Sequence, residues 1–265
     1  MTDTLAHDIR ATYTIWFRDV LRFFKDRMRI VGSLAMPLIF LFIFGSGLAA
    51  AMSGLAGGID YKQYLFPGIL AMTTLFTAVF SALSIVWDRE FGFLREVMVA
   101  PVSRTAVAIG KMLGGSTVAM IQGAIVLALA PAIGVSLSVG QVFELLGLML
   151  LLALVMSSFG MLVGARQKSM EGFQMVMNFL LMPMLFVSGA FFPIEGAPRW
   201  LEIIAKINPV TYGVDPLRQV ALRGSMPPEM LAQMSVQSVG VDVLITLGFI
   251  VAFTVPAIML FAKQD

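Results

Sequence analysis

The stretch Leu145–Val155 reads LLGLMLLLALV, and it decides the fold class of this chain. It opens an interval that continues to Ala165 and contains no Asp, Glu, Lys or Arg. About 20 apolar residues are enough to cross a bilayer as a helix. In lipid, backbone N–H and C=O groups must be satisfied internally, which a helix achieves within a single segment. The stretch therefore predicts a membrane-spanning α-helix.

Five further charge-free intervals have the same character. They run from Ile30 to Ile59, Gln63 to Trp87, Met112 to Phe143, Phe173 to Ile194 and Val243 to Ala262. The whole chain is 58% hydrophobic and only 13% charged, whereas about a quarter of the residues in soluble domains are charged. We expect an all-α membrane protein with a single domain over residues 1–265, because no linker or internal repeat divides it. The six expected spans are 30–52, 65–87, 110–135, 142–165, 173–192 and 239–262.

Lys and Arg are distributed unevenly around these spans. Thirteen lie on one side of the expected membrane and five on the other, four of the five in one long connection. The positive-inside rule predicts that both termini are cytoplasmic. Ala49–Ala51 offers a signal-peptide cleavage site as an alternative, but the 29-residue charged start and the span-length apolar run favour a retained anchor.

Residues 1–29 are predicted to form an amphipathic helix before the first span. Apolar residues recur there every three or four positions, and basic residues form a second stripe. Such a helix can lie in the cytoplasmic membrane interface with its cations at lipid headgroups. Packing on a partner protein is the alternative, and the two are compatible. The residues expected at the interface are Trp16, Phe17, Arg18, Arg22 and Lys25.

The second segment expected in the cytoplasm covers residues 88–105. Charged residues alternate there with large apolar ones, and Pro101 ends the predicted helix. A surface turn between spans is the simpler interpretation. The density of large apolar residues instead favours a docking surface for another protein.

The connection from Pro193 to Ser238 is 46 residues long, which predicts that it is structured. Arg199–Ile207 has an apolar side typical of a helix. Asn208-Pro209 then places a capping side chain before a proline suited to a first helical turn, and Asp215-Pro216 repeats that arrangement. We therefore expect two short helices over residues 193–224, with a restart or bend at Asp215, dipping back into the outer leaflet as re-entrant elements.

The sequence lacks the residues for several chemistries. Gly110-Lys111 is followed by Met112 and preceded by Thr105 where a Walker A loop needs glycine. There is no cysteine, and the only histidine is His7. Intramembrane ionisable residues mark most ion-coupled transporters, and the six intervals contain none. We expect no catalysis by this chain, and a passive channel, a scaffold and a pump driven by another chain remain open.

Three parts of the sequence together resemble the membrane subunits of type-2 ABC export systems, which include drug, polysaccharide and lipo-oligosaccharide exporters. The first is the basic amphipathic start. The second runs from Arg89-Glu90 to Ala100-Pro101-Val102-Ser103-Arg104. The third is the block from Phe186 to Gly224, with Asn208-Pro209-Val210-Thr211-Tyr212 and Val214-Asp215-Pro216-Leu217-Arg218.

The resemblance implies a permease in the inner membrane of a prokaryote that exports an amphiphile, which could be drug-like, a lipid or a lipid-linked glycan. It also implies that the permease works as an assembly with two ABC ATPase subunits and a second copy of itself. ATP and Mg would be bound by the ATPase, with no cofactor on this chain and no nucleic acid as partner. A passive channel or ion-coupled secondary transporter without an ATPase is the alternative. The residues implied in coupling to the ATPase are Arg89, Glu90, Phe91, Leu94, Arg95, Glu96, Arg166 and Lys168. Those implied in an extracellular gate are Phe191, Phe192, Pro193, Trp200, Asn208, Pro209, Tyr212, Asp215 and Arg218.

Overall fold

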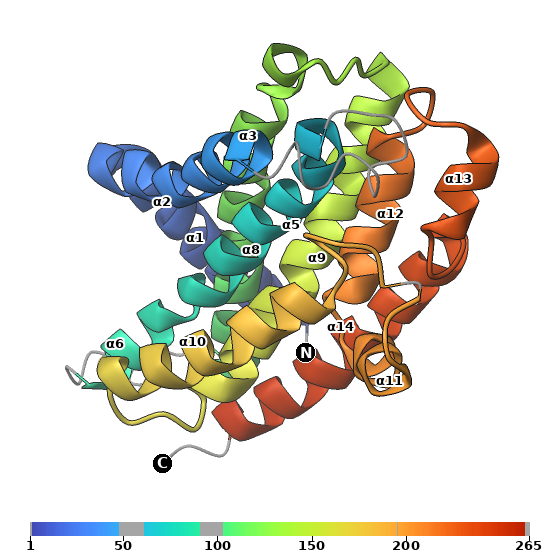
Figure 1. The fold of residues 1–265 in the computed structure, drawn as a ribbon. Helices are drawn as coiled ribbons and strands as arrows, with labels where there is room; N and C mark the ends of the chain where they lie inside the picture. Colours follow the sequence, from blue (N-terminus) through green and yellow to red (C-terminus); the bar gives the residue numbers. More distant parts are fainter. Residues whose placement is uncertain (1, 48–60, 91–102, 195, 263–265) are drawn as a thin grey trace.

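The computed structural model describes residues 2–47, 61–90, 103–194 and 196–262, and this part of the chain is helical and contains no β-sheet (Figure 1). The longer helices are α1 (Thr2–Lys25), α2 (Arg27–Ile39), α5 (Tyr61–Ser81), α8 (Arg104–Leu127), α9 (Val139–Gly164), α10 (Met170–Val187) and α14 (Val239–Ala262). The shorter ones are α3 (Gly45–Gly47), α6 (Leu83–Glu90), α11 (Arg199–Ile207), α12 (Thr211–Ala221) and α13 (Pro228–Gln233). A π-helical turn over Phe40–Phe44 joins α2 to α3, and a 3-10 turn over Ala130–Ile133 follows α8.

Six segments of the described chain are long and apolar enough to cross a membrane, as the sequence predicted. They are Ile30–Gly47, Tyr61–Trp87, Arg104–Leu127, Val139–Gly164, Met170–Val187 and Val239–Leu260. The third begins and ends earlier than expected. The Ser103 hydroxyl caps its start by accepting a hydrogen bond from the Ala106 N–H. Its helix ends at Leu127, before Pro131 of the following 3-10 turn, whose ring nitrogen has no proton to donate.

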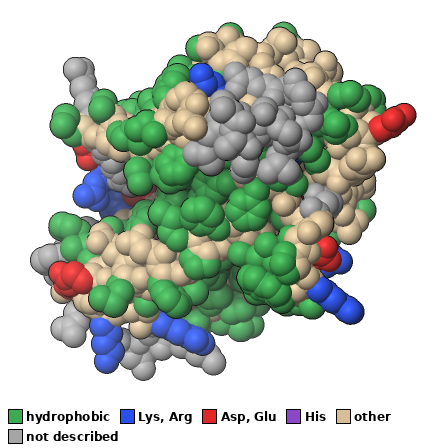
Figure 2. All heavy atoms as spheres, viewed as in Figure 1, with side chains coloured by type: hydrophobic (Ala, Val, Ile, Leu, Met, Phe, Trp, Pro, Cys, Tyr) green, Lys and Arg blue, Asp and Glu red, His purple; other side chains and the backbone are tan. Residues whose placement is uncertain are grey.

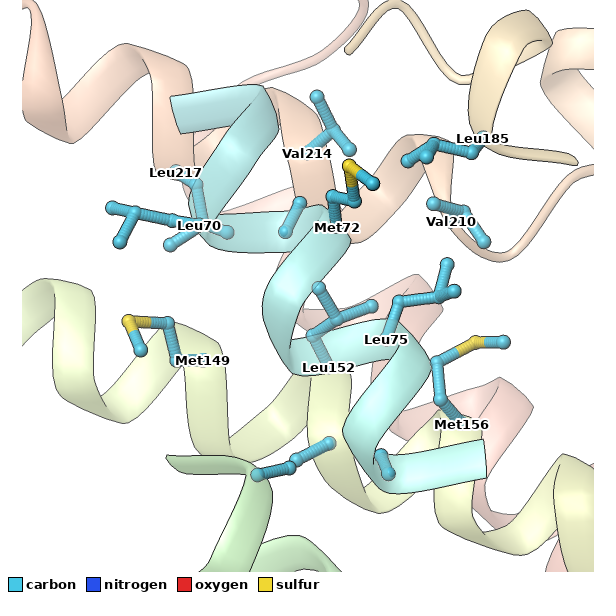
Figure 3. Packing of buried hydrophobic residues seen from close by; sticks show 14 of the residues in the cluster. Leu70, Met72, Leu75, Met149, Leu152, Met156, Leu185, Val210, Val214 and Leu217 are labelled. Carbon is cyan, nitrogen blue, oxygen red and sulfur yellow. The ribbon is translucent and has the colours of Figure 1, made fainter. Parts of the chain in front are cut away.

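Helix α5 lies at the centre of the bundle, with α8, α9 and α12 packed around it. Figure 3 shows apolar side chains of α5, among them Leu70 and Leu75, together with Met149 and Leu152 of α9 and Leu217 of α12. All of these side chains are almost completely buried. Because lipid tails are as apolar as leucine, the stability of such a core comes chiefly from close packing between helices.

Glycines permit the closest approaches between these helices. A Cβ added at Gly160 of α9 would lie 2.8 Å from the Val79 carbonyl oxygen and 3.1 Å from the Val79 Cα, both backbone atoms of α5. A Cβ at Gly110 of α8 would lie 2.9 Å from the Thr12 carbonyl oxygen of α1. Small residues at these positions allow backbone-to-backbone contact, which is the usual basis of tight helix pairs in membranes.

Helix α1 packs along α8. The Trp16 indole N–H donates to the Thr117 hydroxyl at 2.9 Å, and the Thr12 hydroxyl donates to the Ala106 carbonyl at 3.2 Å. Trp16 thus faces α8. A separate apolar stripe of α1 stays exposed, and its members are Ile9, Tyr13, Phe17, Leu21 and Phe24.

The outer surface of the bundle is largely apolar. Figure 2 shows hydrophobic side chains over the middle of one face, with Lys and Arg mainly at its periphery. The exposed side chains of α14 include Leu244, Val251 and Met259, and those of α10 include Met175 and Phe179. Exposure of so many large apolar groups fits a protein whose surroundings are lipid.

Substitution of Gly160 by alanine is expected to destabilise the protein. The added methyl group would meet backbone atoms of α5 that cannot move aside, at a cost of about 1–3 kcal/mol in the free energy of unfolding. Gly147→Ala is the matched control on the same helix, because nothing lies within 4 Å of a Cβ there and alanine favours helix over glycine. Thermal unfolding in detergent measures both. Equal midpoints for the two variants would contradict the close contact at Gly160.

Candidate functional site

Helix α12 carries most of the residues expected in the gate, and it is enclosed by α5, α9 and α14 (Figure 1). Every residue of α12 except Gln219 is buried. Its polar side chains must therefore find partners inside the protein or remain unsatisfied. Those partners define a polar cluster around Asp215 and Arg218, which is the candidate functional site.

Arg218 ties α12 to α5 and to the turn that follows α10. Its guanidinium group lies 4.7 Å from the centre of the Tyr64 ring of α5, in a cation–π contact, and donates a hydrogen bond to the Gly189 carbonyl. Gly189 has a φ of 82°, a left-handed conformation that glycine adopts without strain. Nearby, the Tyr61 hydroxyl donates to the Phe191 carbonyl at 3.0 Å. The segment from Gly189 to Phe191 is thus held by α12 at Gly189 and by α5 at Phe191.

Asp215 connects α12 to the segment that leads into α14. Its Oδ2 accepts hydrogen bonds from the Val236 N–H at 2.9 Å, the Gln237 N–H at 3.0 Å and the Gln219 amide at 3.1 Å. Burial raises the pKa of the Asp215 carboxyl above its usual value, while these backbone donors and the charge of Arg218 act in the opposite direction. The carboxyl group therefore fastens two segments more than 20 residues apart.

Of the restart or bend expected at Asp215-Pro216, the restart is wrong, because α12 runs unbroken from Thr211 to Ala221. Pro216 has no N–H to donate to the carbonyl of Tyr212, four residues earlier. The Thr246 hydroxyl of α14 donates to that carbonyl instead, at 3.2 Å. A donor from α14 thus lets α12 continue through a proline. The Asp215 side chain does not cap a helix start here and instead accepts hydrogen bonds from the segment before α14.

Asn208 also has a role other than the predicted helix cap. The cap position of α12 is Val210, and no side chain caps it. The Asn208 amide donates to the Met184 carbonyl of α10 at 2.6 Å, and its oxygen accepts from the Val210 N–H at 3.1 Å. Asn208 therefore joins the end of α10 to the start of α12.

The other residues expected in the gate fall into two groups. Tyr212 is buried, and its hydroxyl donates to the Lys206 carbonyl at 2.6 Å. Burial raises the pKa of this hydroxyl, and the neighbouring charge of Asp242 acts in the same direction. Phe191 and Pro209 are also buried, whereas Phe192 and Pro193 are partly exposed. Trp200 lies outside the cluster on the exposed side of α11, with Ile203, Ile204 and Ile207.

The residues expected to couple to a partner are only partly described. Phe91, Leu94, Arg95 and Glu96 lie outside the described residues, as does the side chain of Arg89. Glu90, the last residue of α6, accepts a hydrogen bond from the Met170 N–H at 2.9 Å. Because Met170 begins α10, this contact joins the end of the second span to the start of the fifth. Arg166 and Lys168 are exposed in the turn just before α10, and Arg18, Arg22 and Lys25 are exposed on α1.

A groove runs along α5, α8 and α10, with α2 beside one part of it and α1 and α6 beside the other. It consists of two adjoining hollows of about 360 and 420 Å³ that share Phe80 and Asn178. The first is lined mainly by apolar side chains, including those of Met36, Met72 and Phe76, with Thr77 and Gln122 hydrogen-bonded to each other at one wall. The second is more polar, and its lining includes Asp19, Arg22, Ser81, Ser84 and Gln174. The groove thus changes from apolar to polar along its length.

The helices and their exposed apolar surfaces define a multi-pass helical membrane protein. Residues 10–222 match the family described as ABC-2 type transporter. The chain therefore belongs to the ABC-2 type transporter family.

Its relatives include several named permeases. The chain is 29% identical over 211 residues to nodulation protein J of Rhizobium leguminosarum bv. trifolii, covering 78% of this chain and 80% of that one. It is 29% identical over 194 residues to a protein named transport permease ycf38 of Cyanophora paradoxa, covering 71% and 66%. It is 28% identical over 166 residues to the probable multidrug ABC transporter permease YbhR of Escherichia coli (strain K12), covering 62% and 45%.

Sequence reasoning missed the residues that complete the polar cluster. Tyr64, Gly189, Asp242 and Thr246 all contact or approach residues of α12 but lie far from it in sequence. The spacing of Asp242 and Thr246, four residues apart, places them on one helix face and was the only available signal. The helix α13 was also not expected.

Arg218→Lys is expected to destabilise the protein, since an ammonium group lacks the planar surface that lies over Tyr64. The loss should be about 1–3 kcal/mol in the free energy of unfolding. Arg223→Lys is the control, because Arg223 is exposed and pairs with Glu144 at 3.1 Å. The thermal midpoint in detergent is the measurement, and a midpoint of Arg218→Lys equal to that of the wild type would refute the role given to Arg218.

Proposed function

We propose that this chain is the membrane-spanning permease subunit of an ATP-driven exporter. It would move an amphiphilic substrate outward across the membrane, and a separate ATPase subunit would bind ATP and Mg and supply the energy. Two permease copies and two ATPase copies would form the transporter. The observation that carries this proposal is the contact between Glu90 and Met170, because it links the predicted coupling segment to a helix that lines the groove.

The proposed coupling works through α6 and α10. The segment 88–105 would seat in the ATPase, with Arg166 and Lys168 as a second and shorter contact. Closure of the ATPase pair on ATP would push the end of α6, and the Glu90 contact would pass that movement to the start of α10. A ligand shifts a conformational equilibrium only through different affinities for the two states, so ATP must favour the outward-open form.

The proposed substrate path is the groove along α5, α8 and α10. Its change from a polar to an apolar lining suits a molecule with a polar head and an apolar body. Exposed apolar side chains of α10 beside the groove, Met175, Phe179 and Phe186, would face a second copy of the chain. Methionines such as Met36 and Met72 adapt their shape to different apolar surfaces. The name of the relative YbhR includes multidrug transport, which supports a substrate class of this kind.

The proposed outer gate comprises the α12 cluster and the turn from Gly189 to Pro193. Asn208 and Arg218 tie this turn and the end of α10 to α12. Movement of α10 would therefore reach the gate directly. The short helices α11 and α12 would be the re-entrant elements of the outer leaflet, and α1 would lie at the cytoplasmic interface with its exposed apolar stripe toward lipid.

Glu90→Lys is expected to uncouple ATP hydrolysis from export by placing a cation against the N–H at the start of α10. ATP-dependent efflux from vesicles containing the complex should fall at least about 10-fold, because the free energy that couples two sites is typically about 1–3 kcal/mol. Membrane insertion should be unchanged. Glu229→Lys on α13 is the matched control, since that carboxylate is exposed.

Efflux that is unchanged by Glu90→Lys would contradict the coupling contact. Efflux that continues without ATP, or a purified chain that never brings down an ATPase with a Walker motif, would instead support the alternative of a passive channel or ion-coupled transporter. The two results are distinguishable, because the first concerns one residue and the second concerns the energy source.

The proposed orientation can be tested with single cysteines, since the chain has none of its own. A cysteine at Glu229 should react with a membrane-impermeant thiol reagent added to intact cells. A cysteine at Thr105, which is also exposed, should react only after the cells are opened. The opposite pattern would reverse the assignment of both termini to the cytoplasm.

A further inference from the structure

Two carboxyl groups face each other where α12 meets α14. Asp215 is 2% exposed and Asp242 is completely buried. Asp215 accepts hydrogen bonds from the Val236 and Gln237 N–H groups, and Tyr212 accepts one from Thr246, so α12 and α14 run antiparallel and Asp242 lies beside Asp215. The hydrogen bond from Thr246 to the Tyr212 carbonyl holds the same two helix faces together, because Thr246 lies one turn after Asp242 and Tyr212 one turn before Asp215.

The oxygens of this pair are incompletely satisfied. Oδ2 of Asp215 accepts three hydrogen bonds, but its Oδ1 has no donor within the described ranges. Neither oxygen of Asp242 has a donor there. Burying an ionised carboxylate without partners raises the free energy of the folded state. Two such groups in contact also repel each other, so ionisation of both is strongly disfavoured.

The surrounding charges do not neutralise Asp242. Arg218 acts on Asp215, but its guanidinium group is engaged by the Gly189 carbonyl and the Tyr64 ring. The charged side chain that acts on Asp242 is that of Asp215, which carries the same sign of charge. The other titratable or charged side chains on the helices packed around the pair are Tyr212 on α12, Tyr61, Lys62 and Tyr64 on α5, Glu144 on α9, and Arg104 and Lys111 on α8. Glu144 pairs with Arg223, and Lys111 donates to the Ser84 hydroxyl.

We propose that Asp215 and Asp242 form a proton-binding site, in which one proton is shared between the two carboxyl groups. The protonated group would donate its O–H to a free oxygen of the other, so the pair carries a single negative charge. This hydrogen bond fastens α12 to α14. Loss of the proton would leave two negative charges in contact in a buried site, and their repulsion would loosen the joint between the two helices. The proposal does not depend on the proposed export function.

The proposal fixes the sign of a pH effect on stability. Free aspartates in the unfolded chain lose their protons above about pH 4. The folded pair keeps one proton above that pH, so the folded state binds more protons than the unfolded state. Stability then falls as the pH rises, until the folded pair also releases its proton. The thermal midpoint should drop by about 3 °C per pH unit within that window.

Asp242→Asn tests this directly, because its amide donates permanently to Asp215 without a titratable proton. Thermal midpoints of the full chain in lipid nanodiscs are measured from pH 5 to pH 9. The thermal midpoint of the wild type should fall as the pH rises across part of this range. In Asp242→Asn, the fall in midpoint per pH unit should be at most half as steep. Glu144→Gln is the matched control and should keep the wild-type slope.

If the thermal midpoint of Asp242→Asn falls with pH as steeply as that of the wild type, the proposal is overturned. A rise in the wild-type midpoint on addition of Na⁺ or Ca²⁺ at fixed pH, absent in Asp242→Asn, would also overturn it, because the pair would then bind a metal cation. Should Asp242→Asn fail to fold, infrared spectroscopy of the wild type decides. A carbonyl band of a protonated carboxyl group at neutral pH that disappears at higher pH supports the shared proton, and absence of the band overturns it.

Discussion

The structure depends on one constraint, that polar groups enclosed by an apolar bundle must find partners inside the protein. Helix α12 shows the constraint most clearly, since it lies buried among α5, α9 and α14. Arg218, Asp215 and Asn208 each use their side chains to hold a different neighbouring segment. The helix therefore joins the turn after α10, the approach to α14 and the centre of the bundle. A helix with an apolar sequence could occupy the same space, but it could not connect these segments.

The same constraint explains how proline and glycine are used here. Pro216 leaves the Tyr212 carbonyl without its usual donor, and Thr246 supplies one from another helix. Gly189 turns the chain so that its carbonyl meets the Arg218 guanidinium. Gly160 lets α9 approach the backbone of α5. At Pro216 and Gly160, a residue that would weaken an isolated helix is used in a contact between helices, and at Gly189 the turn is joined to α12.

The contacts at the two ends of α10 bear on the proposed transport function. The end of α6 meets the start of α10 through Glu90, and the far end of α10 meets α12 through Asn208. Helix α10 is thus attached at both ends to segments that the proposed export cycle would move, and it borders the groove between them. Its large exposed apolar side chains leave it less enclosed than α5 and α8 beside the groove, which suits an element that shifts relative to the core.

The sequence alone determined the helical class, the six spans and the position of α11, because each follows from composition and spacing within a single segment. Only the tertiary structure decided that Trp16 faces α8, that α12 continues through Pro216, and that Asp242 lies against Asp215. Each of these depends on a group supplied by a helix distant in sequence, and no periodicity within one segment encodes which distant donor or acceptor will be present.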